Sequence, residues 1–251
     1  MKNSLMISLG VKKIKMKSLI VVAHPDDEVL GMGGTIKKLS KQGHDLKIIF
    51  LSTGILARRD LNAKSSNKIF NKKFLSDVKN KISELQQDAK KSSKILGIDE
   101  VEFMDFPDNE LDTISNLQIT KTIENVISDF KPTTVYTTPQ HDVNVDHTSM
   151  FHATLTATRP RKNYYVKKVY SFEVLSSTEW YFPVTFTPNT FVDISKELSF
   201  KIKAIKAYKN ELREFPHPRS IIAIESNARK WGSVSGFNFA EAFSLVRSLD
   251  G

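Results

Sequence analysis

Two short acidic runs, each containing a histidine, hold the residues best suited to chemistry in this chain. The first run, residues 23–28, reads AHPDDE, and the second, residues 142–147, reads DVNVDH. Because close like charges disfavour joint ionisation, runs this acidic need a cation or basic groups to balance them. Two imidazoles and one carboxylate, with a position left open for water, form a known catalytic zinc arrangement. Together the two runs indicate a metal-assisted reaction.

The spacing within the first run suits two different roles. His24 and Asp27 are placed so that a tight turn, stiffened by Pro25, can direct both side chains at one ion. Asp26 cannot easily bind the same ion, so it is free to accept a proton from water. An acidic turn that caps the next helix is the alternative for this run. For His147 taken alone, a core or helix-capping histidine is the commoner outcome.

Both runs follow segments that predict β-strands. Ser18–Ala23 (SLIVVA) is a continuous apolar run, as expected for a strand buried on both faces, and Thr133–Thr138 (TTVYTT) is rich in β-branched residues. In doubly wound sheets, ligands bind at the carboxyl ends of the strands. We therefore expect the two runs to meet at one edge of a sheet, with Asp146 orienting a histidine or Asn144.

The rest of the pattern alternates strand-length apolar runs with stretches of helical period, which predicts an α/β fold with a mostly parallel sheet. Further strands are expected at 46–51, 101–104, 166–175, 180–186 and 190–194. Helices are expected at 30–42, 78–96, 117–130, 147–158, 196–213 and 241–248. Without a repeat or a clear linker, the simpler organisation is an N-terminal tail (1–17) followed by one domain (18–251).

Composition narrows the class of protein. The chain has 251 residues, of which 40% are hydrophobic and 26% charged, as in soluble globular proteins. The absence of cysteine excludes thiolate metal sites and fits a cytoplasmic location. No apolar run approaches the roughly 20 residues that a membrane-spanning helix needs. The net charge of +9 fits either a lysine-rich surface or an anionic partner, but the lysines are scattered and nucleic-acid binding is not expected.

The first run also carries a family resemblance. The segment AHPDDE after an apolar strand, followed by Gly31, Gly33 and Gly34, resembles the LmbE/PIG-L family of zinc-dependent de-N-acetylases. So do the downstream Asp-His pair, residues 51–54 (LSTG), residues 84–97 and residues 240–243 (AEAF), so that the resemblance covers roughly residues 18–246.

That resemblance implies a Rossmann-like three-layer sandwich that removes an acyl group, usually acetyl, from the nitrogen of an amino sugar. The family's metal ligands fall on His24, Asp27 and His147, and its catalytic base falls on Asp26. Zinc is the expected metal, although Fe²⁺ or another divalent ion suits the same nitrogen and oxygen ligands.

One position departs from the family pattern. The second run often reads His-x-Asp-His in the family, where the first histidine is thought to stabilise the oxyanion, but Asn144 stands there in this chain. Asparagine can donate a hydrogen bond, as oxyanion holes elsewhere do, but it cannot carry a proton. His141 could supply a charged donor, with an exposed loop histidine as the alternative.

The substrate side of the site is less specified. Arg58 and Arg59 lie in a long polar segment after the second expected strand, where they could pair with a phosphate or carboxylate or simply be solvated. Residues 180–182 (WYF) fit either a sugar-stacking platform or a core strand.

The expected function is a zinc-dependent hydrolase that removes an N-acetyl group from an amino sugar, nucleotide-sugar or glycoside. The expected partner is thus a small N-acylated sugar, which can be anionic, and the sequence leaves a homo-oligomer open. Two alternatives remain: a deacylase of another small N-acyl compound, and a Rossmann-like binding protein that has lost catalysis.

Overall fold

The computed structural model describes residues 16–52, 72–162 and 164–250, and its centre is a seven-stranded sheet of order β3-β2-β1-β4-β5-β7-β6. The strands are β1 (Lys17–Val22), β2 (Asp45–Ser52), β3 (Glu100–Phe106), β4 (Thr134–Thr137), β5 (Lys168–Phe172), β6 (Thr190–Asp193) and β7 (Ala240–Ser248). The first five strands pair in parallel, whereas β7 pairs antiparallel with both β5 and β6. The predicted, mostly parallel sheet is confirmed.

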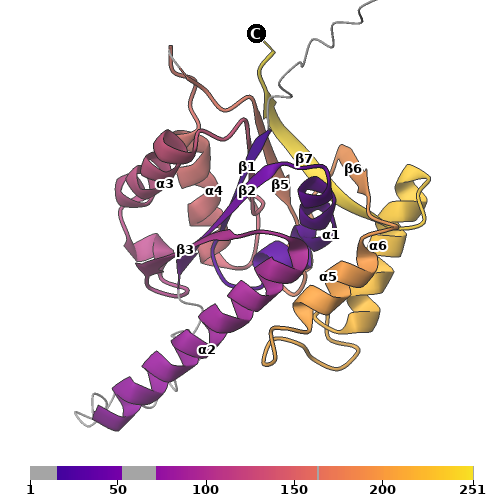
Figure 1. Cartoon of the computed structure of the whole chain (residues 1–251), viewed down its shortest axis with the longest axis horizontal. Helices are drawn as coiled ribbons and strands as arrows, with labels where there is room; N and C mark the ends of the chain where they lie inside the picture. The colour runs from indigo at the N-terminus through magenta and orange to yellow at the C-terminus, as the bar shows by residue number, and fades with distance from the viewer. Residues whose placement is uncertain (1–15, 53–71, 163, 251) are drawn as a thin grey trace, which may run out of the picture.

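Helices cover both faces of this sheet, which gives the predicted three-layer sandwich (Figure 1). The longer helices are α1 (Asp27–Lys41), α2 (Lys72–Leu96), α3 (Asn116–Phe130), α4 (Val145–Ala157), α5 (Leu198–Ile205) and α6 (Ile221–Ser235). Helices α1, α2 and α5 pack together on one side, α3 and α4 pack together on the other, and α6 packs on β7. Among the described helices, none has the length and apolar character to cross a membrane.

The central strand β1 shows why its sequence is continuously apolar. Ile20 and Val22 belong to the core cluster on the α1 side of the sheet, whereas Leu19 and Val21 belong to the cluster on the α3 and α4 side. Because successive strand residues point to opposite faces, a strand covered on both sides needs apolar residues at every position.

Two glycines of α1 allow close packing against the C-terminal third of the chain. A Cβ atom on Gly31 would overlap the ring of Phe172, and one on Gly34 would overlap the side chain of Ile194. Gly31 and Gly34 are therefore required by packing, because any larger residue would push α1 away from its neighbours.

A buried ion pair contacts the backbone of α1 near the kink at Met32 in its middle. The backbone N–H groups of Gly34 and Thr35 donate to the carboxylate of Glu241, at 2.9 and 2.6 Å. Lys201 Nζ donates to the same carboxylate at 2.6 Å and to the carbonyl of Leu30 at 2.9 Å. Glu241 on β7 and Lys201 on α5 thus fix the course of α1 from the far end of the chain.

Several predictions for the C-terminal third are wrong. The expected strand at 180–186 is a short 3₁₀ turn (Thr178–Trp180) followed by irregular chain, which contains Pro183 and so lacks one strand N–H donor. The expected helix at 241–248 is strand β7, because pairing with β5 and β6 overrides local helix preference. Helix α5 is shorter than the expected 196–213, and helix α6 was not predicted.

Candidate active site

The two acidic runs meet at the carboxyl ends of neighbouring strands. His24 lies two residues beyond β1, and His147 lies in the first turn of α4, which follows β4. Strands β1 and β4 pair directly, yet their following helices leave toward opposite faces of the sheet. Such a switch point opens a crevice at the strand ends, where ligands bind in this class of fold.

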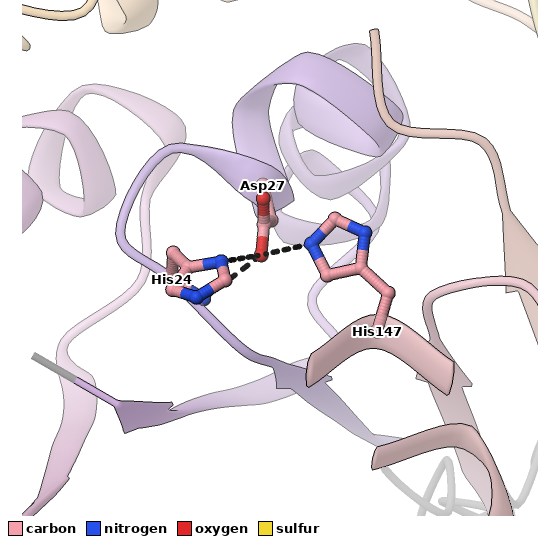
Figure 2. A group of neighbouring side chains, drawn as sticks. All are labelled: His24, Asp27 and His147. Atoms are coloured by element: carbon pink, nitrogen blue, oxygen red, sulfur yellow. Dashed lines mark hydrogen bonds and ion pairs between the residues drawn. The ribbon is translucent and has the colours of Figure 1, made fainter. Parts of the chain in front are cut away.

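Within that crevice His24, Asp27 and His147 form a compact group (Figure 2). The Asp27 Oδ2 atom lies 3.5 Å from His24 Nδ1 and 3.3 Å from His147 Nε2, so the carboxylate sits between the two imidazoles. One ligand atom from each residue lies within 4.8 Å of the other two. The arrangement offers two nitrogens and one oxygen to a single ion, a donor set that suits zinc and similar divalent metals.

A second carboxylate, that of Asp142, contacts the other ring nitrogen of His147. Asp142 Oδ2 lies 3.2 Å from His147 Nδ1 and accepts a hydrogen bond from Thr178 Oγ1 at 2.7 Å, while Asp142 Oδ1 accepts one from the Ser177 hydroxyl. Burial alone would raise the pKa of Asp142, but the hydrogen bonds from His147, Ser177 and Thr178 hold it below its usual value. Asp142 therefore remains ionised and orients the imidazole.

Asp146 supports His24 in a similar way. Its Oδ2 atom accepts from His24 Nε2 at 2.9 Å and from the backbone N–H of Asn109 at 2.7 Å, and its Oδ1 atom accepts from the Leu111 N–H at 2.9 Å. Asp108 Oδ1 lies 3.1 Å from the same His24 nitrogen. Burial lowers the pKa of His24, but Asp108 and Asp146 outweigh that effect and raise it well above its ordinary value.

The group favours positive charge at its centre. His147 Nε2 is buried and makes no well-aligned hydrogen bond among the described residues, although it lies 3.3 Å from Asp27 Oδ2. Burial lowers the pKa of His147, yet Asp27 and Asp142 raise it to about 9. The pKa of Asp27 is lowered by both histidines against the effect of its burial. An unsatisfied nitrogen facing ionised carboxylates is what a metal cation would complete.

The side chain of Asp26 pairs with a cationic partner, Arg219. Its backbone has a φ of 114°, a strained value for a residue with a side chain, and its N–H donates to Glu28 Oε2 at 3.1 Å. Its Oδ2 atom accepts from Arg219 Nη1 at 2.8 Å. Burial raises the pKa of Asp26 to about 7 in spite of Arg219, so the carboxyl group can exchange a proton near neutral pH.

The group opens into a cavity of about 310 Å³. Its described lining residues are His24, Pro25, Asp26, Asp108, Asn109, Asn144, Ser176, Glu211, Arg213, His217 and Arg219. Sequence reasoning missed Asp108, Glu211, His217 and Arg219. Asp108 follows β3, so the strand-end rule could have identified it, whereas no local pattern marks the other three.

The remaining predicted site residues have different placements. Asn144 lines the cavity and caps α4, because its side-chain oxygen accepts from the Asp146 N–H at 2.9 Å. His141 is exposed, stacks on Tyr181 and lines a separate cavity. Arg58 and Arg59 lie outside the described residues. Trp180, in the WYF segment, is 48% exposed rather than part of a core strand.

Comparison with known proteins finds relatives that are named deacetylases. The chain is 25% identical over 245 residues to the diacetylchitobiose deacetylase of Thermococcus kodakarensis, which covers 93% of this chain and 84% of that protein. It is 24% identical over 194 residues to a probable N-acetyl-α-D-glucosaminyl L-malate deacetylase of Bacillus cereus, covering 77% of this chain and 82% of that protein.

Among solved structures, the 4-carboxy-2-hydroxymuconate hydratase of Pseudomonas putida superposes with a TM-score of 0.71 at 19% identity, covering 94% of this chain and 98% of that one. At this identity the similarity shows the shared fold alone. The sequence profile of the GlcNAc-PI de-N-acetylase (PIG-L) family, in contrast, matches residues 19–158, which span both acidic runs. Because this match takes in more than half of the sequence, the chain belongs to the GlcNAc-PI de-N-acetylase (PIG-L) family.

Proposed function

We propose that this protein is a metal-dependent hydrolase that removes an N-acetyl group from an amino sugar or a glycoside of one. The observation that carries the proposal is the convergence of His24, Asp27 and His147, whose buried Nε2 atom makes no hydrogen bond among the described residues, beside a second buried carboxyl group, that of Asp26. Membership of the family and the deacetylase names of both relatives support the same reaction.

In this proposal His24, Asp27 and His147 hold the metal, with zinc as the first candidate. Their nitrogen and oxygen donors fit a catalytic zinc site that keeps one position open. A divalent ion bound there would supply a more acidic water and a polarised acyl carbonyl. Asp142 contacts Nδ1 of His147, and Asp146 contacts Nε2 of His24. These contacts keep both imidazoles oriented toward the ion.

Asp26 is the proton carrier of the proposed reaction. Its carboxylate accepts a proton from the attacking water and returns it to the nitrogen that leaves as the amine. Arg219 holds Oδ2 of Asp26 at 2.8 Å, which leaves Oδ1 for the water. The side-chain oxygen of Asn144 is used for capping, so its amide N–H₂ is the group available to the carbonyl oxygen of the substrate.

One assay separates the proposed deacetylase from the two alternatives, a deacylase of other small N-acyl compounds and a binding protein without catalysis. Zinc-loaded protein is incubated with N-acetylglucosamine, its β-glycosides, UDP-N-acetylglucosamine and simple N-acyl amines, and release of primary amine is measured. We expect turnover on the N-acetylated sugars. Turnover on the simple amines alone would favour a general deacylase, and zinc binding without any turnover would favour a binding protein.

The role of Asp26 is tested by Asp26→Asn. We expect this variant to keep its zinc and to lose turnover by roughly 10²- to 10⁴-fold, the usual contribution of a general base. Asp105→Asn, which changes an exposed carboxylate on β3, is the matched control and should behave as wild type. A rate for Asp26→Asn within a few-fold of wild type would remove Asp26 from this role.

A further inference from the structure

His217 is held on a rigid turn at the wall of the cavity. Its backbone N–H donates to the carbonyl of Glu214 at 3.0 Å, and its own carbonyl accepts from the Ser220 N–H at 2.9 Å. Pro216 and Pro218 flank it and restrict the backbone further. The imidazole is therefore presented to the cavity from a fixed position rather than from a loose loop.

The two ring nitrogens of His217 have different roles. The backbone N–H of Arg219 donates to Nδ1 at 3.1 Å, so Nδ1 is the acceptor and the ring proton is on Nε2. Burial and the nearby guanidinium groups of Arg219 and Arg213 lower the pKa of His217, which keeps the ring neutral at pH 7. Within the described part of the chain, no acceptor is found for Nε2–H.

The surroundings of His217 link it to the proposed base and to an exposed aromatic residue. The side chain of Arg219, two residues along, donates to Asp26 at 2.8 Å, so the His217 turn borders the reacting end of the cavity. On its other side the ring packs edge-on against Trp180, with 6.0 Å between the centroids. His217 thus shares the cavity with Asp26 and also contacts an aromatic side chain that is 48% exposed.

We propose that His217 binds the substrate, with its Nε2–H donating a hydrogen bond to a hydroxyl oxygen of the amino-sugar ring. This inference rests on the proposed function. It adds a substrate contact from the segment between α5 and α6, far from both acidic runs in the sequence. A neutral donor suits a neutral hydroxyl. The same cavity is lined by the carboxylates of Asp26, Asp108 and Glu211 and by the guanidinium groups of Arg213 and Arg219, so its wall also offers acceptors and donors to other sugar hydroxyls.

Kinetics of three variants test the contact. His217→Ala should raise KM for the best N-acetylated sugar roughly tenfold, the usual effect of one lost neutral hydrogen bond, with kcat and zinc content unchanged. His217→Gln places an amide N–H near the position of Nε2 and should recover most of the lost affinity. His152→Ala, which removes an exposed histidine on α4 outside this cavity, should leave KM unchanged.

A binding measurement separates this inference from the proposed function. In protein labelled with ¹⁵N at histidine side chains, N-acetylglucosamine should shift the Nε2–H signal of His217 and leave that of His152 in place. A shift in a protein without hydrolase activity would keep the contact and reject the proposed reaction. No shift, or a KM for His217→Ala within twofold of wild type, would overturn the role of His217 whether or not the enzyme is active.

Discussion

The chain up to the end of α4 and the chain after it contribute to the site in different ways. The first region supplies every side chain of the candidate metal group, each from a loop or helix start directly after β1 or β4. The second region supplies no member of that group, but Arg219 contacts Asp26 and Ser177 contacts Asp142. The side chains of the metal group thus come from two short runs of the first region, and some of the contacts that support them come from far along the chain.

This division has a consequence for substitutions. Changes at the metal group and at the carboxylates that orient its histidines should act on metal binding, and changes in the second region should act on stability or substrate affinity while the metal stays bound. Four predictions test this contrast between the two regions, in order from the largest expected effect to the smallest.

Removal of the metal should have the largest effect. After dialysis against a chelator, we expect turnover to fall to the uncatalysed level and to return when zinc is added, because His24, Asp27 and His147 no longer hold an ion. The melting temperature should also fall, since a ligand present at 100 times its Kd stabilises the folded state by about 2.7 kcal/mol. Amine release and thermal unfolding measure the two effects, and full activity of the chelated protein would contradict the metal-dependent reaction.

The buried pair in the second region should be the next most sensitive site. Lys201→Met leaves the Glu241 carboxylate buried without its cation, so the free energy of unfolding should fall by about 3–5 kcal/mol. Lys203→Met changes an exposed lysine on the same helix and is the control. Urea unfolding gives the difference, and zinc titration should show that the folded variant still binds the ion. Equal stability of the two variants would mean that the ion pair does not hold α1.

Loss of the Asp142 carboxylate, which contacts His147, should have an intermediate effect on zinc affinity. Asp142→Asn removes the charge that faces Nδ1 of His147, and zinc affinity should fall roughly 10- to 100-fold, as for other residues that orient metal ligands. The affinity is measured by competition with a chromogenic chelator, with the exposed Asp129→Asn on α3 as the comparison. Unchanged affinity would show that Ser177 and Thr178 suffice without a charged partner.

The helix cap should have the smallest effect. Asn144→Ala removes the acceptor for the Asp146 N–H, and the free energy of unfolding should fall by about 1 kcal/mol. Asn144→Ser keeps a capping oxygen and should retain most of that stability. Urea unfolding of the two variants checks the prediction, which fails if serine and alanine are equally destabilising.

The same division explains what could be predicted from the sequence. The pattern around β1 and β4 was informative because strands covered on both faces must be apolar throughout, and the acidic runs stand where those strands end. In the second region the sequence of β7 predicts a helix, because its alternation is weak and its pairing partners lie far away in the sequence. Arg219 reaches Asp26 across 193 residues, a contact that no local spacing reveals.

Zinc stoichiometry of the wild-type protein and of His147→Ala tests the central claim most directly. After equilibrium dialysis against zinc, elemental analysis should find one ion per chain in the wild type and none above background in the variant, with the fold intact by circular dichroism. The same zinc content in both proteins would place the ion elsewhere and contradict the site formed by His24, Asp27 and His147.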